Sequence, residues 1–390
     1  MAACDAAGGP RPGEEASRRP LAGVLVVALE QGVAAPYCSS RLAEAGARVI
    51  KIEWPEGDPA RGCDTAVHGQ SSCFVWINRG KQCITLDPKR ADELALLGRM
   101  LARADVFIQN LAPGATEQMG IGSAALRAQH PRLVTCDISG YGDRGRLYAA
   151  KSCDLLMQAE SGLLSISGAP GKSVRIGVPI CEISAGMNAV VAIQQALLGR
   201  ARSGRGAAVA VSLFDSAAEL MSMPYLRTRY GGRAPQRLGL GHPDLVPCGA
   251  FTCADGRDLV IAVRDEREWA DFCREVLREP TLADDPRCAT STARRIHRDW
   301  IDAKVGAVLG TLASAAAIDR LIAAQTPYGS LNSVHDLIEH PLLRTRVTTV
   351  AGRSVELPAS PLSDEPGGDC LPAAPMPDQH GPAIRAEFSA

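Results

Sequence analysis

The sequence predicts an α/β fold built on a parallel sheet, followed by a second, smaller unit. Apolar runs of strand length alternate with helix-length segments along the first half of the chain, and the connections between them are short. Such alternation is typical of parallel strands joined by helices. At 390 residues the chain is also too long for one ordinary hydrophobic core, so two domains are expected.

Each strand of the predicted sheet is a short apolar run with a helical segment after it. Leu21–Leu29 is apolar enough for a buried strand and precedes a predicted helix at Pro36–Ala45. Further strands are predicted at Arg48–Glu53, Cys83–Asp87, Asp105–Gln109, Leu133–Ser139 and Ala207–Leu213, and further helices at Pro88–Arg103 and Ser123–Gln129.

A long apolar helix and a break in composition organise the rest of the chain. Ala185–Leu198 is apolar on almost all sides, which indicates a helix buried in a large domain or at a subunit interface. Residues 224–247 are rich in Gly, Pro and Arg, as is typical of a crossover between domains, and a strand at Leu259–Val263 and a helix at Glu266–Leu277 follow. The resulting division is a large domain (20–224), a linker and small domain (225–326), a return to the large domain (327–363), and disordered tails (1–19 and 364–390).

Composition argues against several classes of partner. With 46% hydrophobic and 22% charged residues the chain has the profile of a soluble globular protein, and its formal net charge of −1 argues against nucleic acid or an anionic membrane. The run Leu21–Leu29 is well short of a membrane span. The 13 cysteines are scattered, without metal-ligand spacing, and no secretory signal precedes them. We therefore expect reduced cysteines, no metal site and a cytoplasmic location.

Two acidic residues and two glycine-rich segments are candidates for chemistry. Glu182 lies just before the predicted long helix, where a carboxylate is either a reactive group or a partner of the helix dipole. Asp154 precedes a helical segment and is interpreted first as a helix cap. Gly140–Gly145 matches Gly-x-Gly-x-x-Gly after a predicted strand, but no helix clearly follows, so a nicotinamide site is the weaker interpretation. Gly239–Gly241 is either a turn or a mobile loop that closes over a site.

A series of short motifs carries a resemblance to a known family. The motifs run in order from Leu21 to about Pro361 and include Ala35-Pro36-Tyr37, Glu44–Glu53, Asn78–Lys81, Ile84–Asp87, Asn110–Gly114, Ser139–Gly142, Ser203–Gly206 and His340–Leu342. Together they resemble the class III CoA-transferases, the CaiB/BaiF type, which include formyl-CoA transferase, mesaconyl-CoA and succinyl-CoA dicarboxylate transferases, and α-methylacyl-CoA racemase. The number and order of the matches, rather than any single one, identify the family.

The resemblance implies an interlocked homodimer of ring-like chains, each with a Rossmann-like large domain and a smaller α+β domain. Gly140–Gly145 would then be a loop of the sheet. It implies no tightly bound cofactor, since coenzyme A arrives as an acyl-CoA co-substrate and reacts with a carboxylic acid. By similarity we expect the CoA contacts at Val33, Ala34, Trp54, Leu86, Asp87, Pro88, Lys89, Asn110, Leu111, Ala112, Lys151, Gly239 and Gly241.

Glu182 takes the position of the family's nucleophile, which is ordinarily aspartate. The family mechanism starts with a carboxylate that attacks the acyl-CoA thioester, and it passes through a mixed anhydride and an enzyme–CoA thioester. Glutamate carries the same group about 1.5 Å further out. Three outcomes are open: a pocket adapted to Glu182, transfer of the role to Asp154, or CoA binding without transfer. We expect the first, with Asp154 as a supporting carboxylate.

Two positions depart from the family pattern for CoA binding. Trp54 and Gln118 stand where arginines are frequent, and loss of guanidinium groups weakens phosphate recognition. The indole of Trp54 could stack on adenine instead. Arg61, Arg79 and Lys89 are possible replacements for the missing positive charge.

The resemblance also indicates the substrate class. Asp154–Gly162 resembles the corresponding segment of transferases that act on short dicarboxylates, and Arg175 would then pair with the distal carboxylate of such an acid. The alternatives are an acyl-CoA racemase or epimerase, whose His-Asp dyad is Cys153-Asp154 here, a non-catalytic CoA-binding homologue, and, outside the family, a nicotinamide dehydrogenase.

Overall fold

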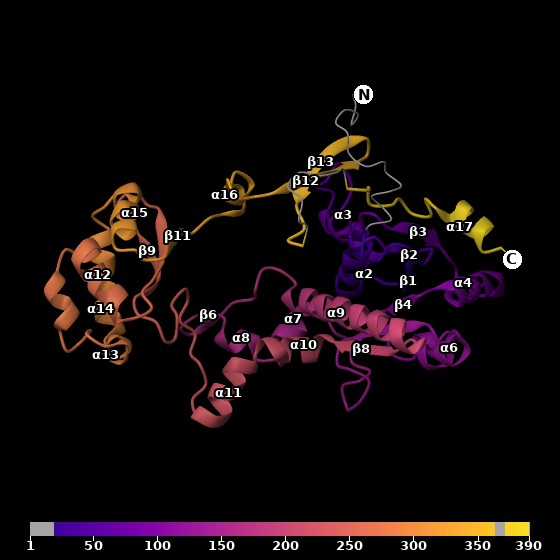
Figure 1. Ribbon diagram of the computed structural model, residues 1–390, viewed down its shortest axis with the longest axis horizontal. Coiled ribbons are helices and arrows are strands. Elements are labelled where there is room, and N and C mark those ends of the chain that lie inside the picture. Colours follow the sequence, from indigo (N-terminus) through magenta and orange to yellow (C-terminus); the bar gives the residue numbers. More distant parts are fainter. Residues whose placement is uncertain (1–18, 363–370, 390) are drawn as a thin grey trace. The chain divides into compact units, whose positions relative to one another are not determined.

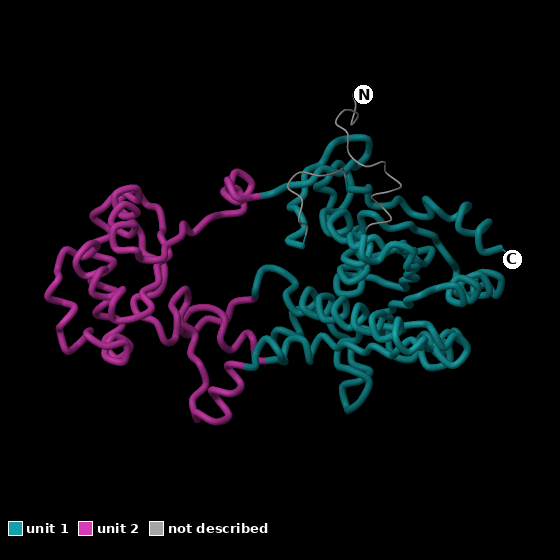
Figure 2. Tube along the Cα trace, in the orientation of Figure 1, with its two compact units in different colours: residues 1–161, 176–222, 344–390 teal, residues 162–175, 223–343 magenta. Residues whose placement is uncertain are grey.

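The computed structural model describes residues 19–362 and 371–389 (Figure 1). The chain forms two compact units: unit 1 comprises residues 1–161, 176–222 and 344–390, and unit 2 comprises residues 162–175 and 223–343 (Figure 2). This division corrects the predicted one in two places. Residues 162–175 belong to unit 2, and unit 1 resumes at Arg344 rather than at residue 327, because β11 (Tyr328–Ser330) pairs with a strand of unit 2. The predicted N-terminal tail lies outside the described residues except for Arg19.

Unit 1 is built on the predicted parallel sheet. Six strands lie in the order β3-β2-β1-β4-β5-β8, and each paired strand runs parallel to its neighbour. Their bounds are β1 Leu25–Leu29, β2 Arg48–Glu53, β3 Gln82–Thr85, β4 Val106–Gln109, β5 Val134–Ser139 and β8 Ala208–Ser212. The chain leaves the sheet at β3 and re-enters on the other side of β1 at β4, so the order reverses between β1 and β4. In such sheets the crevice outside the carboxyl ends of the strands, at this switch point, is the usual ligand site.

Both faces of the sheet are covered, which explains the near-continuous apolar strands. Val27 and Leu29 face one side, where they join a buried cluster with Leu97 and Met100 of α4 (Ala91–Arg103). Alternate residues of a strand point to the opposite side, and there α2 (Ala34–Glu44) packs on the strands.

The other helices of unit 1 follow the strand-helix alternation that the sequence predicts. They are α3 Ser72–Asn78, α5 Ala115–Gln118, α6 Ser123–Gln129, α7 Asp154–Glu160, α9 Ile180–Ser203 and α10 Leu213–Leu220, with a 3₁₀ turn η1 at Pro59–Gly62. Helix α9 begins at Ile180, after Pro179, and not at Ala185 as predicted, so Glu182 lies in its first turn.

Helix α9 is only partly covered by its own chain. Its buried residues face α2 and neighbouring elements, whereas Met187, Val191 and Leu198 are each more than half exposed. By length and composition alone α9 would also be able to cross a membrane, as would α14 (Arg298–Leu309) and α15 (Ser314–Ala323) if they were joined. Core helices of domains pass the same test, so the predicted absence of a membrane partner stays a prediction.

The C-terminal segment corrects the predicted disordered tail. A hairpin of β12 (Thr345–Val350) and β13 (Arg353–Pro358) precedes residues 363–370, which lie outside the described residues. Helix α17 (Gly381–Glu387) then returns to the sheet, where Ile384 and Phe388 are buried in the main cluster. The high Pro and Gly content of this segment is typical of disorder, and it outweighed the signal of these two buried apolar residues.

Unit 2 has its own core around a three-stranded antiparallel sheet, in the order β11-β10-β9. Its strands and helices are α8 Leu163–Ile166, β6 Gly168–Ala169, β7 Lys172–Ser173, β9 Cys248–Thr252, β10 Asp258–Ala262, α12 Glu266–Phe272, η2 Cys273–Leu277, η3 Pro280–Asp284, α13 Ser291–Ile296, α14 Arg298–Leu309, α15 Ser314–Ala323 and α16 Val334–Ile338, while α11 (Ser222–Gly231) crosses into it from unit 1. The predicted strand and helix after residue 258 are confirmed by β10 and α12.

Candidate active site

Glu182 is held by the beginning of α2. Its Oε2 accepts hydrogen bonds from the backbone N–H groups of Val33 (3.1 Å) and Ala34 (3.2 Å). The first amides of a helix lack intrahelical partners, and no side chain of Val33 caps α2. The carboxylate of Glu182 therefore acts as the missing cap, and the positive end of the helix dipole favours its charged form.

The second oxygen of Glu182 is left available. Within residues 19–362 and 371–389 no hydrogen bond reaches Oε1, and the side chain is only partly buried. One oxygen is thus fixed by two amides while the other is free to form a bond. A carboxylate oxygen without a hydrogen bond has its lone pairs available for nucleophilic attack.

Asp154 has a different environment. Its Oδ1 accepts from the amides of Cys181 (2.9 Å) and Glu182 (3.3 Å), and its Oδ2 accepts from Gln158 Nε2 (2.6 Å). Asp154 is 6% exposed. It is a helix cap, as the residues suggested, but it caps α9 from the first turn of α7 rather than capping its own helix. Both oxygens of Asp154 thus accept hydrogen bonds, and Asp154 holds the first turn of α9, which carries Glu182.

Burial and a neighbouring charge make the Glu182 carboxylate costly to ionise. Burial is the largest cause that raises the pKa of Glu182, and the nearby Asp154 carboxylate raises that pKa further. The amides of Ala34 and Val33 act in the opposite direction, but the pKa remains above the ordinary value for glutamate. A desolvated carboxylate is a stronger nucleophile than a hydrated one once it is ionised.

The loop between β1 and α2 is fixed from the neighbouring strand. Asn110, just after β4, donates from Nδ2 to the carbonyl of Gln31 (2.8 Å) and accepts at Oδ1 from the Gln31 amide (3.0 Å). Gly32 follows with φ +70°, a conformation that L side chains rarely adopt, and a Cβ there would lie 3.9 Å from Glu182 Oε2. The switch point of the sheet thus positions the two amides that hold Glu182.

An open groove lies at the same carboxyl edge of the sheet. It has a volume of about 400 Å³ and is lined by Trp54, Pro88, Lys89, Leu111, Ala112, Ala115, Gln118 and Met119. Five of these residues were predicted as CoA contacts. The loops after β2, β3 and β4 therefore bring together residues that are far apart in the sequence.

Comparison with known proteins agrees with this geometry. The family model for CoA-transferase family III matches residues 21–381. The chain belongs to this family. It is 31% identical to an acetyl-CoA:oxalate CoA-transferase of Acetobacter aceti, over 95% of this chain and 96% of the relative, and 32% identical to a succinate–glutarate CoA-transferase of Agrobacterium fabrum, over 89% and 88%. A crystal structure of a CaiB/BaiF family protein from Brucella suis has a TM-score of 0.82 and 30% identity, covering 95% of this chain and 99% of that one.

The family assignment confirms the predicted activity class, so the protein is a CoA-transferase. The Gly140–Gly145 segment is accordingly a loop after β5 rather than a dinucleotide site. A Cβ on Gly140 would collide with Ser152, and the next helix, α7, begins only at Asp154.

The predicted replacements for the two family arginines behave differently. Arg61 forms a two-pronged ion pair with Glu53 and lies over the Phe74 ring, and Arg79 pairs with Glu44. Lys89, in contrast, lines the groove beside Gln118. The role of Lys89 as a replacement for the missing arginines stays a prediction.

Several other predicted CoA contacts do not line the groove, among them Leu86, Asp87 and Lys151. Leu86 is buried in the main cluster, so its side chain is part of the core. Asp87 accepts the amide of Lys89 at 2.9 Å and shapes the turn that presents Pro88 and Lys89. Lys151 is exposed on the segment before α7.

Three predicted residues belong to unit 2. Arg175 is exposed at the end of its short N-terminal segment. Gly239, with φ +60°, donates its amide to Gly168 (2.8 Å), and the Gly241 amide donates to Leu238 (2.9 Å). The roles of these residues remain predictions.

Sequence reasoning missed Gln158. Its Nε2 holds Asp154, and its Oε1 accepts from the Ile176 amide at 3.0 Å. Asp154 and Gln158 are four residues apart on α7, a spacing at which helical side chains meet. That spacing was the available signal. Among the described residues no cluster of acidic, histidine or cysteine side chains that could hold a metal ion is found.

Proposed function

We propose that this CoA-transferase moves CoA from an acyl-CoA to a short dicarboxylic acid, with Glu182 as the covalent carrier. The observation that carries the proposal is the asymmetric environment of Glu182, in which two α2 amides hold Oε2 while Oε1 stays unbonded among the described residues. CoA is a co-substrate and not a tightly bound cofactor.

The first half of the reaction loads Glu182. Oε1 attacks the thioester carbonyl carbon, a C–O bond forms, the C–S bond breaks, and CoA leaves as the thiolate. The thiolate then attacks Cδ of the resulting anhydride. Charge develops on Oε2, where the amides of Val33 and Ala34 stabilise it. The donor acid leaves with the bridging oxygen, and Glu182 becomes a CoA thioester.

The second half is the reverse, with the acceptor acid as the attacking carboxylate. No proton or redox partner is needed, because each step exchanges one acyl bond for another. Oε2 remains at the two amides throughout, so the amides act on every transition state centred on Cδ. Asp154 keeps α9 and Glu182 in register with them.

Oxygen labelling tests this route. With the acceptor acid labelled with ¹⁸O, one labelled oxygen should pass to Glu182 in each turnover and appear in the donor acid released in the next. Mass spectrometry of the released donor acid measures it. Transfer of CoA without any ¹⁸O in the donor acid would contradict a carboxylate carrier.

The acceptor class rests on the relatives and on Arg175. The curated relatives act on oxalate and glutarate, as their names state, and Arg175 is an exposed guanidinium that suits a distal carboxylate. Arg175→Ala should raise KM for dicarboxylic acids and leave that for monocarboxylic acids of equal length unchanged. An equal loss for both classes would refute the role of Arg175.

The groove is proposed to take the nucleotide part of CoA. The indole of Trp54 would stack on adenine and Lys89 would meet a phosphate. Lys151, Gly239 and Gly241 are proposed further contacts.

We also propose a cytoplasmic homodimer with a Rossmann-like large domain and interlocked, ring-like chains, without a nucleic-acid or membrane partner. The strand order supports the domain type. The exposed Met187, Val191 and Leu198 of α9 support burial by a second copy. Light scattering should give twice the mass of the chain at micromolar concentration, and a monomer would contradict the proposal.

A further inference from the structure

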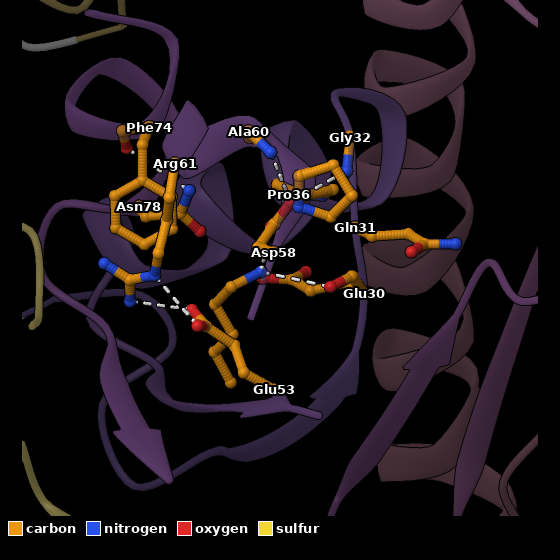
Figure 3. Close-up of polar contacts among 12 residues, drawn as sticks. Glu30, Gln31, Gly32, Pro36, Glu53, Asp58, Ala60, Arg61, Phe74 and Asn78 are labelled. Carbon is orange, nitrogen blue, oxygen red and sulfur yellow. Dashed lines mark hydrogen bonds and ion pairs between the residues drawn. The ribbon is translucent and has the colours of Figure 1, made fainter. Parts of the chain in front are cut away.

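A group of four buried charged side chains contacts the backbone of the loop and helix start that hold Glu182. Two of them, Glu30 and Asp58, are labelled in Figure 3. The group consists of Glu30, Lys51, Asp58 and Lys81, whose side chains are all fully buried. Lys51 Nζ lies 2.7 Å from Asp58 Oδ2, Lys81 Nζ lies 2.7 Å from Glu30 Oε1, and Lys51 also lies 3.7 Å from Glu30 Oε1. Two carboxylates and two ammonium groups therefore form one neutral network.

The network is attached to the backbone on both sides of the Glu182 contacts. Asp58 Oδ1 accepts from the Gly32 amide (3.4 Å), and Lys51 Nζ donates to the carbonyl of Glu30 (3.1 Å). Lys81 Nζ donates to the carbonyl of Pro36 (2.9 Å). Residues 30, 32 and 36 are thus fixed by buried charges, and the amides of residues 33 and 34 lie between them.

Asp58 is itself held firmly. It caps η1, where its Oδ1 also accepts from the Ala60 amide at 2.9 Å, and its Oδ2 is occupied by Lys51. Glu30 is similarly saturated, since its Oε2 accepts from Ser39 Oγ at 2.6 Å. Neither carboxylate has freedom to follow a displaced loop.

Stability alone is a poor reason for such a network. Each buried ion loses its hydration, and replacing buried ion pairs with apolar residues of similar volume is often neutral or stabilising. What the network supplies is directional contact at fixed backbone atoms. A small displacement of those atoms matters here, because about 1 Å of misplacement at a reacting group can cost about a hundredfold in rate.

We infer that Asp58, together with Glu30, Lys51 and Lys81, forms a positioning group that fixes the Val33 and Ala34 amides onto Glu182 and thereby sets the rate at which Glu182 is loaded with CoA. The inference rests on the proposed role of Glu182 as the carrier. Asp58 touches neither substrate nor reacting atoms in this account and acts through the loop.

The test compares Asp58→Asn with a matched control, Asp105→Asn. Like Asp58, Asp105 accepts a backbone amide, that of Leu25 (2.8 Å), and pairs with a cation, Arg200 (2.9 Å), but Asp105 is partly exposed and lies at the amino end of β1, whereas Asp58 is buried and contacts the loop after β1. Three quantities are measured for each protein: hydrogen exchange at the Val33 and Ala34 amides, the rate of CoA adduct formation at Glu182 in a single turnover, and KM for acyl-CoA in steady-state transfer.

In the wild type, the Val33 and Ala34 amides should exchange as slowly as those of the buried strands. Asp58→Asn should speed their exchange by about tenfold or more and slow adduct formation by about tenfold to a hundredfold, with KM for acyl-CoA unchanged. Asp105→Asn should match the wild type in both. If Asp58→Asn does not fold, Glu30→Gln takes its place with the same expectation. The exchange rates of the wild-type amides test the inference without any variant.

Three results would overturn the inference: wild-type amides that exchange as fast as exposed loops, a folded Asp58→Asn with wild-type exchange and loading, or equal losses in Asp105→Asn. If the wild type forms no adduct at Glu182 but exchange responds to Asp58→Asn as expected, the proposed carrier is refuted and the positioning of the loop is supported. The carrier role of Glu182 and the positioning role of Asp58 can therefore be refuted independently of each other.

Discussion

Replacing Glu182 with aspartate, the residue usual in the family, should make this enzyme slower. The side chain of aspartate is one methylene shorter, which withdraws the carboxylate by about 1.5 Å. The contacts of Oε2 with the Val33 and Ala34 amides are now 3.1 and 3.2 Å, so both would exceed the range of a hydrogen bond in Glu182→Asp.

The size of the effect follows from what these amides do. Each hydrogen bond to a charged group is worth about 1.5–3 kcal/mol, and removing one donor from an oxyanion site typically lowers kcat by about 10²–10³. A shift of the backbone of α9 towards α2 would restore part of the two hydrogen bonds and so part of the lost kcat. Such movement is opposed by the close contact of α9 with α2, where a Cβ on Gly186 would already lie 2.7 Å from the carbonyl oxygen of Ala34. We expect kcat to fall by about a hundredfold.

Steady-state transfer measured with a purified acyl-CoA and dicarboxylic acid distinguishes this effect from weaker binding. KM for acyl-CoA should be unchanged, because the residues that line the groove are untouched. Glu182→Gln, which keeps the length and the amide contacts, should be inactive because it lacks the nucleophile. If Glu182→Asp is as fast as the wild type or faster, the hydrogen bonds from the Val33 and Ala34 amides are not needed for catalysis. Such a result would refute the proposal that these amides fit the site to glutamate.

Three further predictions concern the same unit. Burial raises the pKa of Glu182 in the folded state, so ionisation of Glu182 costs stability as pH rises through that pKa. Glu182→Gln should therefore melt at a higher temperature than the wild type at pH 8, and the two proteins should melt alike below the ordinary pKa of glutamate. An equal difference in melting temperature at both pH values would contradict this. Trp54→Ala should raise KM for acyl-CoA about tenfold with kcat unchanged, since stacking on a base is worth about 1–3 kcal/mol, while Trp54→Phe should retain most of the affinity; equal KM values for wild type and Trp54→Ala would exclude stacking. Gly186→Ala should destabilise the protein by about 1–3 kcal/mol in urea unfolding, because the added Cβ would meet Ala34 and Tyr37, and unchanged stability would show that α2 and α9 can separate freely.

The sheet of unit 1 was predictable because local pattern and burial agree. Strands such as β1 and β2 are buried on both faces, and their apolar character is visible in any short window of sequence. Helix α17 was not predictable, because Ile384 and Phe388 join it to the core through contacts with segments that are far away in sequence. Arg99, for example, donates to the Phe388 carbonyl from 289 residues away.

The active site likewise has features that the sequence predicts and features that it does not. Family resemblance was enough to single out Glu182, Trp54 and Lys89, and the groove brings the last two together. The cap that Asp154 provides for α9 spans 27 residues, and the hydrogen bonds of Glu182 to α2 span almost 150. Such partners depend on how the helices pack, which periodicity and spacing do not report.

Whether Glu182 carries CoA is decided by peptide mapping with mass spectrometry, after the enzyme has been incubated with an acyl-CoA donor and quenched. Succinyl-CoA and a short panel of other acyl-CoAs serve as donors, and Glu182→Gln as the control. We expect a CoA adduct on the peptide that contains Glu182, localised to that residue and missing from the control. An adduct on Asp154, or no adduct with any donor that supports turnover, would contradict it.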